Sequence, residues 1–201
     1  MGAICRLRRG ARCRLTLDAQ ACFRAVLDAM AHPGRIVAAD APDPPTPLDP
    51  ATAAVLLTLV DAETPLWLDD ALAPAGSWIG FHCGAALVAR DKAAFGLAGG
   101  PGTGEPGLAG ALAGFRTGTD DAPEDGATVI LQVAALGRGR ALRLSGPGLA
   151  TPAVLRVDGL AAGFVAEWAA NHAGFPHGVD LILCAGRHLA ALPRSVRVEE
   201  G

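Results

Sequence analysis

Two apolar segments near the C-terminus constrain the fold of this chain more than any other feature. Residues 179–184 and 188–192 are almost wholly apolar, and Ala185-Gly186-Arg187 between them predicts the turn of a β-hairpin. A second hairpin is predicted within residues 127–144, where two apolar runs meet at Gly137-Arg138-Gly139. Strands that are apolar on both faces are typical of a sheet that is covered on both sides.

Helices between these strands are expected to supply the cover. They are predicted from Asp18 to His32-Pro33-Gly34, from Asp49-Pro50 to Val60, and from Leu160 to Asn171. The first carries an apolar stripe of Cys22, Phe23, Val26, Leu27 and Met30. Further short strands are expected at 35–38, at 66–68 and within 78–88. The sequence therefore predicts a single α/β domain over residues 16–201, with a layered mixed β-sheet flanked by helices.

Charge is distributed unevenly along the chain. Five arginines and no acidic residue occupy the first 14 positions, and the rest of the chain carries 12 basic and 20 acidic side chains. An acidic body argues against a nucleic-acid-binding protein, which needs a basic face opposite the phosphates. We interpret residues 1–15 as a basic, disordered N-terminus, with a short basic arm as the alternative. No uninterrupted run of 18 apolar residues occurs, so no membrane span is expected.

The cysteines indicate reduced thiols rather than a disulfide framework. Their number is odd, they are widely spaced and none forms a CxxC motif; they are Cys5, Cys13, Cys22, Cys83 and Cys184. Free thiols fit a cytoplasmic protein. Cys22 and Cys184 lie in apolar patterns and are expected in the core.

Several familiar site motifs are incomplete. Residues 100–104 are glycine-rich but lack the Lys-Ser/Thr and the following helix of a phosphate loop, so we interpret them as a linker. Lys92, the only lysine, lies in a polar segment, which favours a surface residue over a Schiff-base lysine for pyridoxal phosphate (PLP). The five histidines lack helical metal-ligand spacing, and no GxSxG serine occurs. We therefore assign no metal, no cofactor and no catalytic residue.

A polar loop leading into a buried strand is the strongest candidate for a site. Residues 117–128 offer hydroxyls, backbone N–H groups and carboxylates directly before an apolar run. Asp180 begins another buried strand, and Arg194 just past the partner strand can supply its counter-charge. The two residues form either an internal ion pair or a loop cap, which we favour, or part of an anion or partner site at a sheet edge. The candidate ligand or partner residues are Thr117, Gly118, Thr119, Glu124, Asp180, Arg194 and His82.

Many short motifs occur in one order along the chain. They are Phe23-Arg24 with Leu27, Ala29-Met30 and Pro33-Gly34; Leu56-Leu57-Thr58-Leu59 with Asp61, Thr64-Pro65 and Trp67-Leu68; Phe81-His82; Thr117-Gly118-Thr119 with Pro123-Glu124 and Gly126-Ala127-Thr128; Leu142-Arg143-Leu144-Ser145-Gly146-Pro147-Gly148; Phe175-Pro176-His177-Gly178-Val179-Asp180-Leu181-Ile182-Leu183; and Leu192-Pro193-Arg194. In this order they resemble the H subunit of the bacterial carbon-phosphorus lyase system. The resemblance covers Asp18 to Glu199.

That resemblance implies a cytoplasmic protein of phosphonate utilisation with a fold like the large domain of PLP-dependent transferases, but without the cofactor. It implies a homodimer that joins the G, I and J subunits in a core complex. With the G and I subunits, and assisted by the ATPase-like L subunit, such a protein would help a phosphonate to displace adenine from MgATP. The product would be a ribose 1-phosphonate 5-triphosphate. In the family the radical carbon-phosphorus cleavage belongs to the J subunit and the nucleosidase-type groups are expected on the I subunit. This chain would then be structural rather than catalytic.

The residues alone leave an alternative function open. An independent enzyme that binds a small anion or a nucleotide would place its site at the Thr117–Glu124 loop with Asp180 and Arg194. A PLP enzyme is a third hypothesis, and it depends entirely on Lys92.

Overall fold

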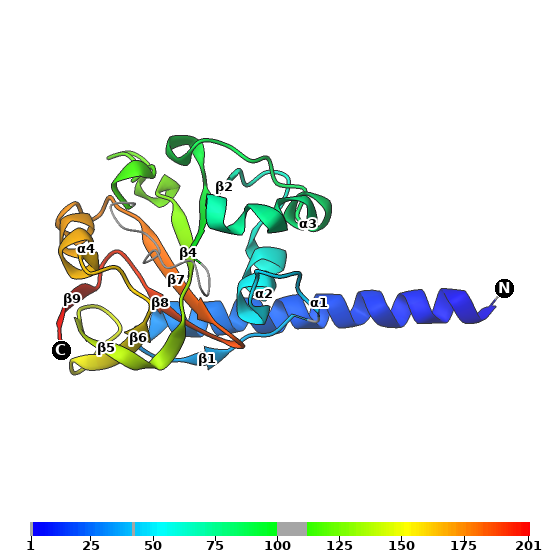
Figure 1. The fold of residues 1–201 in the computed structure, drawn as a ribbon, viewed down its shortest axis with the longest axis horizontal. Helices are drawn as coiled ribbons and strands as arrows, with labels where there is room; N and C mark the ends of the chain where they lie inside the picture. The colour runs from blue at the N-terminus through cyan, green and yellow to red at the C-terminus, as the bar shows by residue number, and fades with distance from the viewer. Residues whose placement is uncertain (1, 42, 100–111) are drawn as a thin grey trace.

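The computed structural model describes residues 2–41, 43–99 and 112–201, with side chains from residue 17 onward except at residue 113. The fold is α/β as predicted, with a six-stranded sheet and a three-stranded sheet covered by helices (Figure 1). Segment 100–104, interpreted above as a linker, lies outside the described residues. Within the described part, no helix is both long and apolar enough to cross a membrane.

The large sheet is mixed and has the strand order β1-β8-β7-β4-β3-β2. Its strands are β1 (Val37–Ala38), β2 (Leu66–Leu68), β3 (Phe95–Gly99), β4 (Thr128–Gln132), β7 (Asp180–Ala185) and β8 (His188–Leu192). Strands β2, β3, β4 and β7 run parallel, and β8 is antiparallel to its neighbours β7 and β1. The predicted hairpin over residues 179–192 is therefore confirmed. Because parallel strands start at the same edge, the segments that precede β4 and β7 meet there.

The described residues contain four α-helices: α1 (Gly2–Ala31), α2 (Pro50–Leu59), α3 (Gly76–His82) and α4 (Phe164–Ala173). Short 3-10 helices connect other elements, namely η1 (Asp70–Ala75), η2 (Arg90–Lys92), η3 (Leu112–Gly114) and η4 (Pro123–Asp125). The predicted positions of α2 and α4 are confirmed to within a few residues at each end. Of the two positions expected for a strand within 78–88, the one around Phe81 is wrong, since Phe81 lies on α3. At the other, residues 86–88 run beside β2, where Leu87 forms an isolated parallel bridge with Leu66.

Helix α1 is longer than the sequence predicts. It ends before His32-Pro33-Gly34 as expected, but it begins at Gly2, so residues 2–15 are helical where we had expected disorder. Leucine, alanine and arginine favour helix in this segment, and no proline interrupts it. Phe23 and Leu27, assigned to the buried stripe, are 46% and 52% exposed, because the helix packs through a narrower stripe around Cys22 and Val26.

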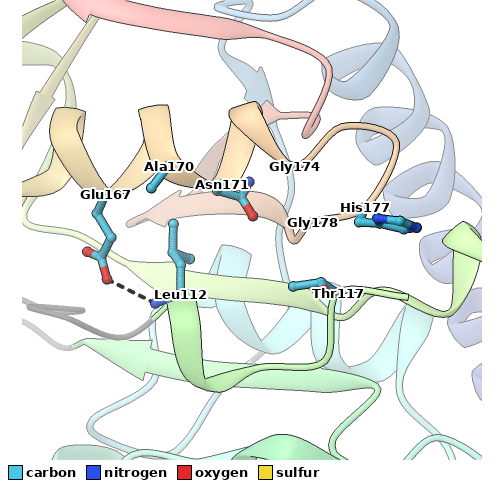
Figure 2. Close-up of a pocket in the computed structure, with 8 residues that line it drawn as sticks. All are labelled: Leu112, Thr117, Glu167, Ala170, Asn171, Gly174, His177 and Gly178. Carbon is cyan, nitrogen blue, oxygen red and sulfur yellow. Dashed lines mark hydrogen bonds between the residues drawn. The ribbon is translucent and has the colours of Figure 1, made fainter. Parts of the chain in front are cut away.

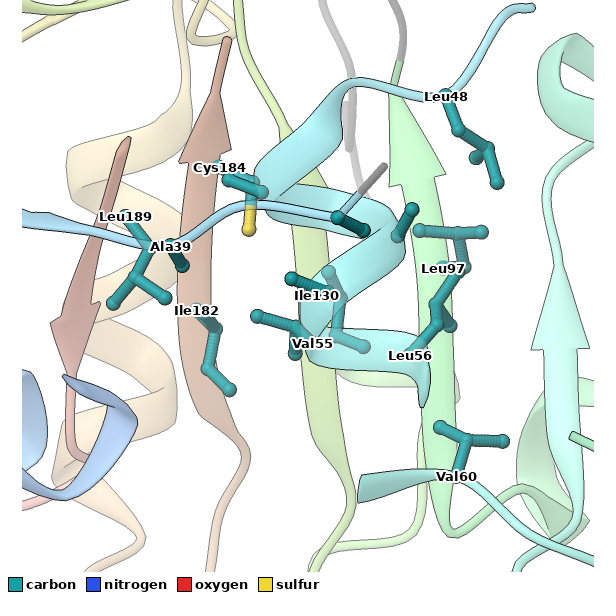
Figure 3. Packing of buried hydrophobic residues seen from close by; sticks show 14 of the residues in the cluster. Ala39, Leu48, Val55, Leu56, Val60, Leu97, Ile130, Ile182, Cys184 and Leu189 are labelled. Atoms are coloured by element: carbon teal, nitrogen blue, oxygen red, sulfur yellow. The ribbon is translucent and has the colours of Figure 1, made fainter. Parts of the chain in front are cut away.

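Successive residues of the central strands enter two separate cores. Ile130 of β4 and Ile182 of β7 pack with Val55 and Leu56 of α2 on one face (Figure 3). Val129, which precedes Ile130 in β4, belongs to the other core, which contains Trp168 of α4. Since successive side chains of a strand point to opposite faces of the sheet, a nearly continuous apolar sequence supplies buried side chains to both cores. The prediction of a sheet covered on both faces is confirmed.

The second predicted hairpin is wrong. Strand β5 (Ala135–Ser145) follows β4 but pairs with β6 (Ala153–Asp158) and β9 (Arg197–Glu200) in the small antiparallel sheet, ordered β6-β5-β9. Strand β4 has no free edge, because β3 and β7 pair with it on both sides. Gly137 and Gly139 both have φ of 84° at an irregularity within β5, where they shift the register instead of turning the chain.

Candidate functional site

The predicted site residues converge at the edge where β4 and β7 begin. Thr128 of β4 pairs with Asp180 of β7, and Asp180 N donates to the Ala127 carbonyl at 3.1 Å. Farther out, Gly178 N donates to the Thr117 carbonyl at 2.8 Å. The loop of residues 117–127, which we call the edge loop, is thereby joined to the start of β7. His82 is not part of this group, since it lies at the end of α3 and lines a different pocket with α1 and α2.

Arg194 and Asp180 form an internal ion pair, which was the favoured prediction. Arg194 donates to the carboxylate of Asp180 through its backbone N at 2.7 Å and through Nη2 at 2.6 Å, and Nε lies 3.2 and 3.1 Å from the two oxygens. Nη1 donates to the Pro123 carbonyl at 2.7 Å, and Nη2 reaches the Gly126 carbonyl at 3.5 Å. The two side chains are only 12% and 23% exposed. The guanidinium is thus neutralised and held by the edge loop.

The edge loop also satisfies its own polar groups. Thr119 N donates to the Ala122 carbonyl, and Ala122 N donates to the Thr119 hydroxyl, both at 3.1 Å. Gly118 has φ of 83°, and a Cβ there would lie 2.6 Å from the Pro123 carbonyl oxygen, so the turn requires glycine. Glu124 is exposed within η4. The predicted residues are brought together, but mainly to hold the loop in one conformation.

A small pocket lies beside the edge loop, between α4 and η3 (Figure 2). It measures about 220 Å³ and is lined by Leu112, Thr117, Glu167, Ala170, Asn171, Gly174, His177 and Gly178. Glu167 accepts a hydrogen bond from Leu112 N at 3.1 Å. The amide of Asn171 bonds both backbone groups of Val179 at 2.8 and 2.9 Å. Both polar side chains from α4 are therefore occupied by the protein itself.

The charges around this pocket do not suit an anion. Among the described residues that line it there is no lysine or arginine, and Glu167 contributes a carboxylate. His177 Nε2 lies 3.1 Å from an Asp120 carboxylate oxygen without a hydrogen bond, so this contact becomes an ion pair only when the imidazole is protonated. A phosphonate or a triphosphate would meet negative charge here and no free guanidinium.

The opposite edge of the sheet contains a polar group that the sequence analysis missed. In open α/β sheets ligands bind beyond the carboxyl ends of the parallel strands, and Gln132 lies at that end of β4. Its side chain is 2% exposed, accepts from Asp49 N and Thr52 Oγ1 at 2.8 Å, and donates to the Pro47 carbonyl at 2.9 Å. The amide caps the start of α2. Its only sequence signal is one amide within an apolar strand.

The remaining residues considered for chemistry are dispersed. Lys92 is exposed on η2. Cys22, Cys83 and Cys184 are free and buried, and burial raises the pKa of the Cys83 thiol to about 11 and raises the pKa of Cys184 as well. Across the described ranges, no three histidine, cysteine or carboxylate side chains are grouped so that they could hold a metal ion.

Comparison with known proteins assigns the chain to a family. A model of the family described as bacterial phosphonate metabolism protein (PhnH) matches residues 13–199. The alpha-D-ribose 1-methylphosphonate 5-triphosphate synthase subunit PhnH of Rhizobium meliloti is 38% identical over 186 residues, 90% of this chain and 90% of the relative. The putative C-P lyase subunit protein HtxG of Stutzerimonas stutzeri is 37% identical over 183 residues, 89% of this chain and 85% of the relative. This chain therefore belongs to the bacterial phosphonate metabolism protein (PhnH) family.

Proposed function

We propose that this chain is a subunit of ribose 1-methylphosphonate 5-triphosphate synthase in phosphonate metabolism. The observation that carries the proposal is the relative of that name, which aligns with 90% of this chain and 90% of its own length. Similarity over nearly the whole of both chains argues for the same role in the same kind of assembly, rather than for one shared motif.

Within the synthase this chain acts as a structural subunit. The complex transfers a phosphonate to C1′ of the ribose of MgATP and releases adenine. The polar groups at the edge loop support a non-catalytic role, because Arg194 is neutralised by Asp180 and its three nitrogens donate within the protein. The edge loop also lies at the amino ends of the parallel strands, opposite the edge where α/β enzymes usually bind substrates.

The fold is related to the large domain of PLP-dependent transferases, and the chain works without PLP. A Schiff-base lysine needs a desolvated pocket that lowers the pKa of its amine. Lys92 is the only lysine of the chain, and its side chain is exposed on η2, which supports a cofactor-free role.

The partners are a second copy of this chain and the G, I and J subunits of the core complex, in the cytoplasm. Large apolar side chains on the surface support this many-sided assembly, because such residues mark interaction sites when they gather. Among the side chains that the structure describes, the most exposed are Phe81 at 83%, Val154 at 59%, Leu17 at 58% and Phe175 at 56%.

Reconstitution tests the structural role. We expect no adenine release from MgATP and methylphosphonate by this chain alone, release by the complete set of subunits, and loss of release when this chain is omitted. Lys92→Ala is the matched control and retains full activity. Adenine release by this chain alone would show that it is catalytic, and full activity of the remaining subunits without it would show that it is dispensable. Either result contradicts the proposal.

The alternative of an independent anion-binding enzyme makes a different prediction. A crystal soaked with phosphonate, phosphate or nucleotide would then bind the anion at the edge loop. The neutralised Arg194 and the carboxylate of Glu167 in the adjacent pocket argue against that outcome.

A further inference from the structure

The small sheet buries one face and exposes the other. Its inner face contributes apolar side chains to the core around Trp168, namely Leu142, Leu144, Leu155, Val157 and Val198. Because side chains alternate along a strand, Arg143 of β5, Arg156 of β6 and Arg197 of β9 point away from that core, and all three are exposed. The small sheet lies on the opposite side of the molecule from α3, so this face is separate from the exposed Phe81 (Figure 1).

The three arginines form a diagonal line across the three strands, which we call the arginine row. In the register of the sheet, Arg143 pairs with Val154 of β6 and with Glu199 of β9. Arg156 follows Val154 by two residues and Arg197 precedes Glu199 by two, so they are diagonal neighbours of Arg143 on its two sides. Diagonal neighbours on a sheet face are about 7–8 Å apart, so the row extends over about 15 Å.

The arginine row lacks the counter-charges that other arginines of the chain have. Other arginines are paired, Arg35 with Asp28, Arg140 with Glu200, Arg187 with Asp40 and Arg194 with Asp180. In the part of the chain that the structure describes, no carboxylate lies within 4.0 Å of the guanidinium groups of the row. Of the residues whose side chains are not described, only Glu105 is acidic.

Two carboxylates near the row leave its positive charge in excess. Asp158 lies 3.9 Å from Arg138, which offsets it. Glu199 is then the single carboxylate set against three arginines. Positive charge is concentrated here although residues 15–201 carry 12 basic and 20 acidic side chains. Such a patch on an acidic protein indicates a negatively charged partner.

The composition of this face is that of a protein interface. Arginine is enriched at interfaces, where its planar guanidinium binds carboxylates through two hydrogen bonds. Val154, which is 59% exposed, lies beside Arg143 at the centre of the row and offers an apolar contact. Alternate residues of an extended chain are about 7 Å apart, so an acidic segment can place successive carboxylates along the row.

Other occupants fit this face less well. A two-fold contact between copies of this chain centred on the row would set arginines against arginines. Small phosphate ligands bind in concave sites that bury most of their surface, whereas these side chains are exposed on the face of a sheet. A nucleic acid is disfavoured by the acidic body of the chain.

We propose that the arginine row is a docking surface for an acidic segment of a different subunit of the synthase. The carboxylates of that segment pair with Arg143, Arg156 and Arg197, and an apolar side chain covers Val154. The inference rests on the proposed function, because the partner is another subunit of the same complex.

Charge reversal in the full-length chain tests the docking. Arg143→Glu with Arg156→Glu should bind the remaining synthase subunits, purified together without this chain, at least about tenfold more weakly in biolayer interferometry, because carboxylates then face carboxylates. Arg143→Gln with Arg156→Gln, which only removes the charges, should weaken binding less. Binding of the unmodified chain should weaken as the salt concentration rises, whereas binding of the reversed chain should not.

Arg24→Glu with Arg116→Glu is the matched control, since it reverses two exposed arginines outside the small sheet. It should leave the affinity for the other subunits unchanged. All four substituted side chains are exposed, so each variant should keep the thermal unfolding midpoint of the unmodified chain. With the reversed chain at saturating concentration, adenine release should return to the normal rate, because the row binds a partner and not the substrate.

Two results would overturn the docking. One is a reversed chain that binds the other subunits as tightly as the unmodified chain does. The other is a reversal that abolishes binding of MgATP, inorganic phosphate or a single-stranded DNA oligonucleotide to this chain alone, while subunit binding is unchanged.

Failure of the docking and failure of the proposed function give different results. If the reversed chain binds and supports adenine release normally, the chain is a synthase subunit that docks through another surface. If the unmodified chain itself neither binds the other subunits nor supports adenine release, the proposed function is wrong, and the docking with it.

Discussion

Asp180 receives its counter-charge from Arg194, the second residue after a strand that runs antiparallel to its own. The carboxylate accepts the backbone N–H of Arg194 as well as Nε and Nη2. Because Nη1 continues to the Pro123 carbonyl, one side chain joins the start of β7, the end of β8 and the edge loop. The pair therefore determines how the loop lies against the sheet.

Removing the guanidinium leaves the Asp180 carboxylate in a mostly buried place without its cation. We expect Arg194→Met to lower the free energy of unfolding by about 2–4 kcal/mol in urea titrations. Arg138→Met is the control, since Arg138 is exposed and lies 3.9 Å from Asp158, and it should cost less than about 0.5 kcal/mol. Adding Asp180→Leu to Arg194→Met should recover part of the loss. An Arg194→Met chain as stable as the original contradicts this account.

Gln132 holds the start of α2 against the end of β4. Gln132→Leu removes one acceptor and one donor, which leaves the Asp49 N–H, the Thr52 hydroxyl and the Pro47 carbonyl without their partner. We expect a loss of about 2–4 kcal/mol in the free energy of unfolding. Gln20→Leu on the exposed side of α1 should change it by less than about 0.5 kcal/mol. Equal effects of the two substitutions would mean that the buried amide has no special role.

Gly118 tests whether the edge loop requires a left-handed turn. Gly118→Ala combines φ of 83° with a Cβ only 2.6 Å from the Pro123 carbonyl oxygen, and it should cost more than about 2 kcal/mol of unfolding free energy. Gly186→Ala separates the two causes, because its φ is 56° and no atom lies within 4 Å, so it should cost about 1 kcal/mol. Gly80→Ala, inside α3, has neither problem and should be neutral or stabilising. Thermal unfolding in one buffer ranks all three, and any other order would count against the turn geometry.

The buried thiols predict how stability depends on alkaline pH. An ordinary thiol ionises near pH 9.0, whereas burial raises the pKa of Cys83 to about 11 in the folded chain. Between these values the unfolded chain releases a proton that the folded chain keeps, so the free energy of unfolding falls as pH rises from 9 to 11. Below pH 9 the thiols contribute no pH dependence. In Cys83→Ala the alkaline decline should be shallower, and identical slopes for the two proteins would refute the assignment.

The edge loop shows how far sequence reasoning reached at the candidate site. A carboxylate at the start of an apolar strand requires a partner, so Asp180 and Arg194 could be paired from sequence alone. The same reasoning could not find the hydrogen bonds from Arg194 to the carbonyls of Pro123 and Gly126. These two residues precede Arg194 by 71 and 68 positions in the chain, and only the folded structure brings them next to it. His82 was placed with this group and lies elsewhere, because no local pattern specifies which elements become neighbours.

The sequence by itself determined the buried strands, most of the helix boundaries and the family, because these follow from local periodicity, from glycine and proline signals and from the order of short motifs. Apart from the β7–β8 hairpin, only the tertiary structure decided which strands pair. The apolar run from β4 into β5 looks like one hairpin, yet β3 and β7 occupy both edges of β4 and send β5 into another sheet. It also decided that Arg194 is neutralised and that Gln132 caps a distant helix. Pairing and neutralisation depend on contacts between remote segments, and a local pattern does not encode them.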